Sequence, residues 1–127
     1  MRRCVARIRA KTPPSVQVLT DDYDLQDIVC VNLERAVQTC VDVAAHILAD
    51  INVPAPDSMA AGFDELQKLG YLPEPVAVQL KKAVGFRNIS VHAYQEIDWA
   101  VVFSIITTRL SVFSDFAGCI KARLHTG

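Results

Sequence analysis

The chain has 127 residues, of which 51% are hydrophobic and 21% are charged, which is enough for one domain with its own core and too little for two. This balance excludes a disordered chain, and the net charge of −1 excludes the strong basic excess of many nucleic-acid binders. The high apolar content indicates that a partner, most simply a second copy of the chain, covers part of the surface.

The four cysteines give no sign of a metal site. No two of them form a C-x-x-C pair, and no histidine stands at ligand spacing from any of them, so we expect neither a metal nor a cofactor. Three of them lie in apolar stretches, where free thiols pack as small hydrophobic groups. We therefore expect reduced cysteines and a cytoplasmic protein.

No apolar leader segment is visible at the start of the chain. The longest apolar stretch, residues 28 to 51, is interrupted by charged side chains. It therefore predicts a core helix and not a membrane span.

Residues 1 to 10 predict a first helix with Cys4, Val5 and Ile8 on one face, ended by the prolines that follow. No cap precedes this helix, so we expect it to be truncated at its N-terminus, within a single domain covering residues 1 to 127. Five Lys and Arg residues precede the first acidic residue, Asp21. Such a run is either a solvated helix face or, in the alternative, a patch that contacts phosphates.

A long second helix is predicted from about residue 24 to residue 50. Its apolar residues form a broad face at helical spacing, which is typical of a helix packed on two sides. Its polar residues form one stripe, which consists of Asn32, Arg35, Gln38 or Thr39, Asp42 and His46. The stripe is either a solvated face or the second wall of a cleft, for which Arg35, Asp42 and His46 are the candidate residues. His46 alone is either a hydrogen-bonded structural histidine or a reactive one.

Three further helices complete the predicted fold. A short helix covers residues 59 to 69, a fourth runs from Glu74 to His92 or Tyr94, and the last covers residues 99 to 124. No strand pattern competes with them. The sequence therefore predicts an all-α fold, an antiparallel bundle of four main helices plus a shorter one.

The segment GFRNISVHAYQEIDW, residues 85 to 99, concentrates four groups capable of chemistry, which are Arg87, Asn88, His92 and Tyr94. If it is helical, Asn88 and His92 are neighbours one turn apart, whereas Arg87 and His92 point about 140° apart. One regular helix therefore does not focus Arg87 and His92 on one atom. A distortion near His92, or a second copy of the helix across a two-fold axis, would bring them together.

Arg87 and His92 suit RNA cleavage without a metal ion. Arginine offers a fixed cationic fork that matches phosphate, and histidine exchanges protons near neutral pH. His92 could deprotonate the ribose 2′-OH or protonate the leaving oxygen, while Arg87 stabilises the charge of the transition state. In the alternative, Arg87 forms a surface ion pair, for instance with Glu96 or Asp98, and His92 is a helix C-terminal residue stabilised by the helix dipole.

The pattern R-N-x-x-x-H-x-Y, formed by Arg87, Asn88, His92 and Tyr94, resembles the signature of the HEPN superfamily and, more closely, that of the HepT toxin family. The helix LQDIVCVNLERAVQTCVDVAAHI, the helix SMAAGFDEL and the segment GFRNISVHAYQEIDW look like that family in the same order. The resemblance implies a helical-bundle homodimer in which Arg87 and His92 of both subunits line one cleft. It also implies a metal-independent endoribonuclease acting on tRNA or mRNA, with Arg87 and His92 catalytic and Asn88 supporting.

The same resemblance implies a protein partner, the MntA-type minimal nucleotidyltransferase antitoxin. Tyr94 matches the tyrosine that this partner modifies with AMP to silence the toxin. Bulky, negatively charged nucleotides beside the cleft would exclude an anionic RNA both sterically and electrostatically.

Two other functions remain compatible with the residues. The chain could be a non-catalytic binding module, a regulatory or substrate-recruiting subunit of the nucleotidyltransferase, which the modest net charge fits slightly better. It could also be a helical bundle that binds free nucleotides such as ATP.

Overall fold

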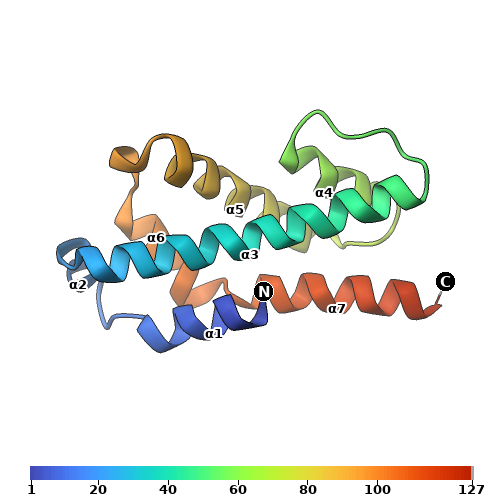
Figure 1. Ribbon diagram of the computed structural model, residues 1–127. Coiled ribbons are helices and arrows are strands. Elements are labelled where there is room, and N and C mark those ends of the chain that lie inside the picture. Colours follow the sequence, from blue (N-terminus) through green and yellow to red (C-terminus); the bar gives the residue numbers. More distant parts are fainter. Residues whose placement is uncertain (127) are drawn as a thin grey trace.

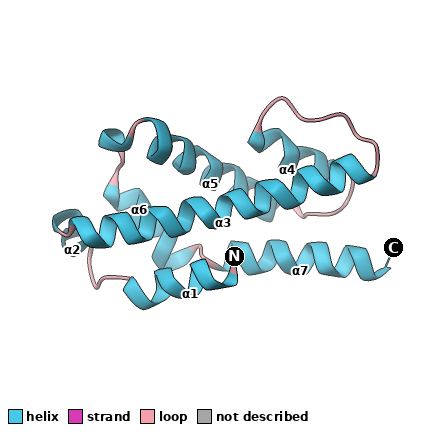
Figure 2. Cartoon of the chain, in the orientation of Figure 1, coloured by secondary structure: helices cyan, strands magenta, loops and turns pink. Residues whose placement is uncertain are grey.

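The computed structural model describes residues 1 to 126, with side chains as far as Leu124, and this part of the chain consists of helices and loops without a strand (Figure 1, Figure 2). The elements in chain order are α1 (Arg2–Lys11), α2 (Val16–Asp21), α3 (Tyr23–Asp50), α4 (Met59–Lys68), α5 (Glu74–His92), the 3-10 helix η1 (Tyr94–Glu96), α6 (Trp99–Thr108) and α7 (Ser111–Thr126). The predicted all-α fold is confirmed.

Helix α3 is the central element, and it extends along most of the molecule between α1 and α7 on one side and α4 and α5 on the other (Figure 1). It begins where the Asp22 carboxylate accepts a hydrogen bond from the backbone N–H of Leu25 at 3.1 Å, which satisfies one of the free amides of the first turn. Its broad apolar face is buried on both sides, as the sequence predicts. The fully buried Leu33 and Val37 lie at its centre.

The core is closed by aromatic contacts between helices that are distant in the sequence. Phe63 of α4 meets Phe116 of α7 edge to face, with ring centroids 5.9 Å apart. Both residues are buried, with at most 2% of their surface exposed. This contact joins α4 to α7 beside α3, which both helices also touch.

The cysteines behave as the sequence predicts. All four are free thiols, and Cys30 and Cys40 are buried. Burial raises the pKa of Cys30 to about 11 and that of Cys40 to about 12. Both thiols therefore stay protonated at neutral pH and pack as small hydrophobic groups.

The predicted last helix, residues 99 to 124, is in fact two helices that meet at an angle of 51°. Two threonine hydroxyls at the break donate to backbone carbonyls of the preceding turn, Thr107 to Phe103 at 2.7 Å and Thr108 to Ser104 at 2.6 Å, and such bonds bend helices. Arg109 then leaves helical geometry, and its guanidinium donates to the Gln79 side chain of α5. The prediction failed here because a contact with another helix decides where the chain turns.

Helix α2 is the second departure from the predicted elements, since the sequence predicts no helix between the first one, residues 1 to 10, and the long one that starts near residue 24. It has only six residues, is capped by the Ser15 hydroxyl, and buries Leu19 completely. So short a helix has too few residues to show a period, and its contacts with α3 and α6 stabilise it.

No single helix among the described residues has the length and apolar content to cross a membrane. Helices α6 and α7 have that length and apolar content only when they are taken together, as a bent pair.

Candidate functional site

The motif residues lie at the C-terminal end of α5 and directly after it. The helix ends at His92, because Ala93 departs from helical geometry with φ −146° and ψ 53° while its N–H still donates to the Ile89 carbonyl. Tyr94 therefore begins the separate turn η1 and does not continue the helix. This departure follows His92, so Arg87 and His92 stay on one regular helix and the distortion does not bring them together.

The part of the Arg87 side chain next to the backbone, as far as Nε, is buried in the protein. It lies between Ala83 and Ser90 on the face of α5 that packs on α3, and both of these neighbours are buried. The Arg87 Nε is buried and has no hydrogen-bond partner among the described residues, and no described carboxylate lies within ion-pair distance of the guanidinium. A buried polar atom without a partner is costly, so this cation is available for an anion that the chain itself does not supply.

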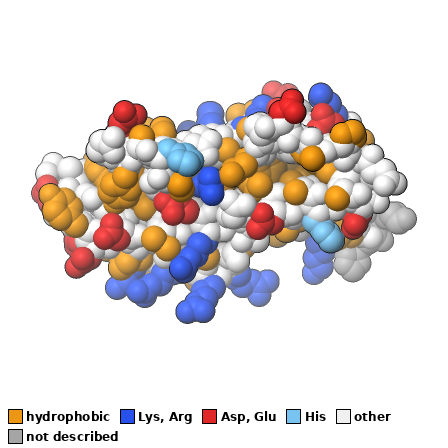
Figure 3. Space-filling view, turned by 45° about the horizontal axis from the view of Figure 1, so that its top comes forward, with side chains coloured by type: hydrophobic (Ala, Val, Ile, Leu, Met, Phe, Trp, Pro, Cys, Tyr) orange, Lys and Arg blue, Asp and Glu red, His pale blue; other side chains and the backbone are white. Residues whose placement is uncertain are grey.

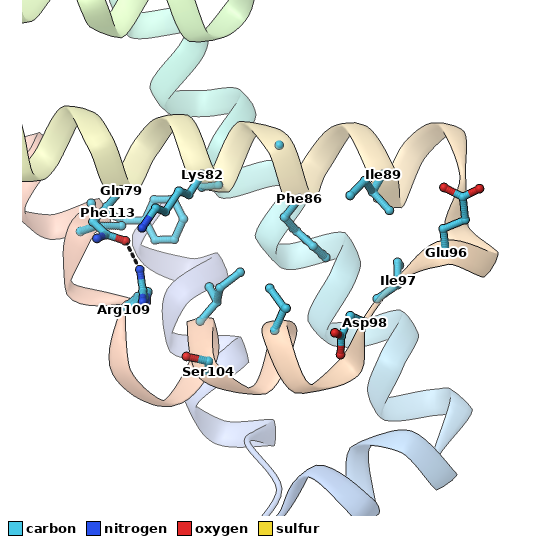
Figure 4. A pocket seen from close by; sticks show the side chains of 15 residues that line it. Gln79, Lys82, Phe86, Ile89, Glu96, Ile97, Asp98, Ser104, Arg109 and Phe113 are labelled. Carbon is cyan, nitrogen blue, oxygen red and sulfur yellow. Dashed lines mark hydrogen bonds between the residues drawn. The ribbon is translucent and has the colours of Figure 1, made fainter.

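The alternative ion pair of Arg87 with Glu96 or Asp98 does not form. Asp98 caps α6 through a hydrogen bond from the Ala100 N–H to its carboxylate at 2.9 Å, and Figure 4 shows both acids along the groove between α5 and α6. The turn η1 directs them to this side.

His92 and Asn88 are exposed on the last two turns of α5. Their side chains are neighbours in the helix but are not joined by any hydrogen bond of the described chain. An exposed imidazole at the end of a helix can exchange protons with solvent or with a bound molecule.

Tyr94 is fixed from two directions. Its hydroxyl donates to the Asp27 carboxylate of α3 at 3.2 Å, and its ring meets that of Trp99 edge-on with centroids 5.9 Å apart. Partial burial, together with nearby Cys30 and Asp27, raises the pKa of the Tyr94 hydroxyl above its ordinary value. The phenol is therefore neutral at physiological pH, although 39% of the residue is exposed.

The polar residues that α3 turns toward the motif segment differ from those expected. Asp27, Cys30 and Glu34 recur at helical spacing, and Glu34 accepts a hydrogen bond from the buried Ser90 hydroxyl of α5. Sequence reasoning missed Asp27, Glu34 and Ser90 as site residues. The available signal was the spacing of three and four between Asp27, Cys30 and Glu34, which places them on one face of α3.

The residues predicted as a second wall bond only within their own helix or to no described side chain. Arg35 and Asp42 are exposed, and Asp42 accepts a hydrogen bond from the Gln38 side chain of its own helix at 2.8 Å. His46 is exposed and lies 3.4 Å from Asp50, also on α3. Neither Arg35, Asp42 nor His46 bonds to α5 within the described chain, and their role in a cleft remains a prediction.

An open groove of about 500 Å³ separates α5 from α6 next to the motif. Its walls are mainly apolar, and Figure 4 shows Phe86, Ile89 and Ile97 directed into it, with the bond between Gln79 and Arg109 at one end. Ile89 and Val101 on opposite walls are 42% and 52% exposed, so a continuous apolar surface borders the motif.

Cations gather on another side of the molecule. Arg2, Arg3, Arg7 and Arg9 of α1 are exposed, and Figure 3 shows Lys and Arg side chains along its lower edge, where α1 lies. None of these arginines pairs with a carboxylate of the described residues. They form a solvated basic face, and its contact with phosphates stays a prediction.

No group of three or more His, Cys, Asp or Glu side chains within the described part of the chain is arranged to hold a metal ion. The groups that the motif segment offers are a partly buried guanidinium without a carboxylate, an exposed imidazole and a neutral phenol. These groups can bind a phosphate and move a proton beside it.

Comparison with known proteins places this arrangement in a family. The family model described as Ribonuclease HepT-like matches residues 1–120. The mRNA nuclease HepT of Shewanella oneidensis is 35% identical over 122 residues, which is 96% of this chain and 91% of that protein. The tRNA nuclease HepT of Aphanizomenon flos-aquae is 30% identical over 94 residues, covering 74% of this chain and 64% of that protein.

Solved structures of this family have the same fold. A tri-AMPylated HEPN toxin of Shewanella oneidensis, in complex with an MNT antitoxin, superposes with a TM-score of 0.88 at 36% identity, covering 95% of this chain and 90% of the other. A toxin–antitoxin structure with AMP-PNP gives a TM-score of 0.86 at 33% identity, covering 94% and 90%. The chain therefore belongs to the HepT-like family of HEPN proteins.

Proposed function

We propose that this chain is the toxin of a HepT/MntA-type toxin–antitoxin pair and that it is a metal-independent endoribonuclease acting on tRNA or mRNA. The observation that carries the proposal is that a partly buried Arg87 without a carboxylate partner and an exposed His92 both lie near the C-terminal end of one helix. The nuclease names of the two HepT relatives support it. Both proposed substrates are cytoplasmic RNAs, so we place the protein in the cytoplasm.

In the proposed reaction, Arg87 binds the scissile phosphate and stabilises the negative charge that develops on it. His92 removes the proton of the ribose 2′-OH or protonates the leaving oxygen. Asn88, one turn before His92, orients the imidazole ring. None of these steps requires a metal ion to activate water, because the nucleophile is a hydroxyl of the RNA itself.

We propose that two copies of the chain form the active site. On one α5 helix, Arg87 and His92 point about 140° apart, so a second α5 across a two-fold axis can supply the missing partner. The apolar groove with the exposed Ile89 and Val101 lies beside the motif and gives such a contact a hydrophobic surface.

The nuclease activity is tested with the purified chain and a mixed RNA substrate in excess EDTA. We expect cleavage at the same rate with and without the chelator, since no step uses a metal. The extent of cleavage is measured by gel electrophoresis of end-labelled tRNA and mRNA. Cleavage that stops in EDTA and returns with Mg²⁺ would contradict metal independence, and no cleavage of either RNA would favour the non-catalytic subunit.

We further propose that an MntA-like nucleotidyltransferase silences the chain by transferring AMP to Tyr94. The hydroxyl of Tyr94 lies two residues from His92, at the end of the motif helix. Attached nucleotides would therefore stand beside the phosphate-binding groups and repel RNA. The AMPylated state of the Shewanella oneidensis toxin, whose chain is 36% identical, supports this proposal.

The acceptor is identified by incubating the chain with its nucleotidyltransferase and ATP and measuring the intact mass. We expect additions in units of AMP on the wild-type chain and none on Tyr94→Phe, which keeps the ring contact with Trp99 but has no hydroxyl. Tyr23→Phe, a more exposed tyrosine at 77%, is the matched control and should be modified like the wild type. Additions that persist on Tyr94→Phe would assign the acceptor to another residue.

A further inference from the structure

The hydroxyl of Tyr94 has a carboxylate in contact with it in the same chain. Asp27 of α3 accepts its hydrogen bond at 3.2 Å, and Trp99 of α6 supports the ring from the side. The Tyr94 side chain is thus positioned by α3, which is far from η1 in the sequence, and by α6, which follows η1 directly. A phenol that is merely exposed would need no such support.

The environment of Tyr94 works against loss of its proton. Burial comes first, and the nearby thiol and carboxylate of Cys30 and Asp27 add to it, so that the pKa of the phenol lies above its usual range. A free phenolate is therefore rare at neutral pH, and a neutral phenol is a poor nucleophile toward phosphorus. The proton has to leave while the new bond forms, and this requires a base already in contact with the oxygen.

We propose that Asp27 is the general base for the transfer of AMP to Tyr94. The proposal rests on the proposed function, which takes Tyr94 as the acceptor and ATP on the partner enzyme as the donor. As the Tyr94 oxygen bonds to the α-phosphorus, the bond from that phosphorus to the oxygen bridging to the β-phosphate breaks. Pyrophosphate leaves with the electron pair, and the phenolic proton passes to the Asp27 carboxylate and then to water. Aspartate has the same role toward the substrate hydroxyl in protein kinases.

The other groups near Tyr94 do not suit this role. The Cys30 thiol is buried and its pKa is raised to about 11, so it stays protonated and cannot accept the proton. The Glu34 carboxylate lies two turns further along α3 than Asp27 and accepts the hydrogen bond of the Ser90 hydroxyl instead. Asp27 is exposed and bonds to no other described side chain, so it can take the proton and release it to solvent.

The test compares Asp27→Asn with wild type in single-turnover AMP transfer, with saturating nucleotidyltransferase and ATP, followed by intact mass. Asparagine has the same shape and can still accept the Tyr94 hydrogen bond, but it cannot take the proton. We expect the maximal rate of the first AMP addition to fall by about 100-fold or more. The enzyme concentration at half-maximal rate should stay the same, and Asp27→Glu should restore part of the rate.

The matched control is Asp24→Asn, another exposed acid in the same part of α3, which should react like the wild type. A wild-type rate for Asp27→Asn would overturn the role of Asp27 while leaving Tyr94 as the acceptor. An unchanged maximal rate with a higher half-maximal concentration would also overturn it, because Asp27 would then serve docking only. Modification of Tyr94→Phe at the wild-type rate would instead show that Tyr94 is not the acceptor. Asp27 would then have no proton to remove in the transfer.

Discussion

Replacement of His92 by alanine is expected to lower RNA cleavage in EDTA by about two to four orders of magnitude, because a positioned acid or base contributes that much to proton transfer. The imidazole stands at the exposed end of α5 and has no described side chain bonded to it. Its removal should therefore leave the fold intact and act on the reaction alone. The measurement is the initial rate of cleavage of a labelled RNA at saturating protein.

Gln95→Ala provides the control for His92→Ala, since Gln95 is an exposed residue of the neighbouring turn η1. This variant should cleave RNA at the wild-type rate. Undiminished cleavage by His92→Ala would show that the histidine takes no part in the reaction. The motif segment would then have a non-catalytic role.

The fold was predictable where a long helix shows its own period and its own start signal. Helices α3 and α5 begin and end within a few residues of the predicted limits. Asp22 and Pro75 mark their starts, and the apolar spacing continues along each helix. The break between α6 and α7 was not predictable in this way. Ile106, Leu110 and Phe113 continue the helical spacing across it, and the turn depends on Arg109 reaching Gln79 of another helix.

The candidate site shows the same division between local and long-range information. Arg87, Asn88, His92 and Tyr94 could be selected from one short stretch, since their chemistry and spacing are local. The contacts from Tyr94 to Asp27 and from Ser90 to Glu34 join residues 67 and 56 positions apart. Sequence spacing on α3 alone gave no reason to prefer Asp27 and Glu34 over the more conspicuous stripe that contains His46.

Arg87→Met is expected to change activity and stability in opposite directions. The buried Arg87 Nε without a partner costs folding free energy, on the order of 1–3 kcal/mol for a buried unsatisfied group, and methionine fills similar space without a polar atom. We expect the free energy of unfolding to rise by about 1 kcal/mol, measured by urea denaturation. RNA cleavage should fall by about 100-fold to 1000-fold, because the cation that stabilises the transition state is lost.

Arg3→Met is the matched control for stability, since Arg3 of α1 is exposed and forms no ion pair with the described residues. It should change the free energy of unfolding by less than about 0.5 kcal/mol. A marked loss of stability in Arg87→Met would show that the arginine supports the fold. The inference that the buried Arg87 is kept for binding an anion would then be wrong.

Mixing the two inactive chains tests whether the site is shared between subunits. In a mixed dimer of His92→Ala and Arg87→Met, the intact Arg87 and the intact His92 belong to different chains. If the reaction uses such a pair, co-refolding the two variants should restore about a quarter of wild-type activity, because roughly half the dimers are mixed and each keeps one of two such pairs. If Arg87 and His92 act from the same chain, the mixture stays inactive. That result would overturn the shared site, and the bend at Ala93 would not explain it, because Arg87 and His92 both precede this bend on α5.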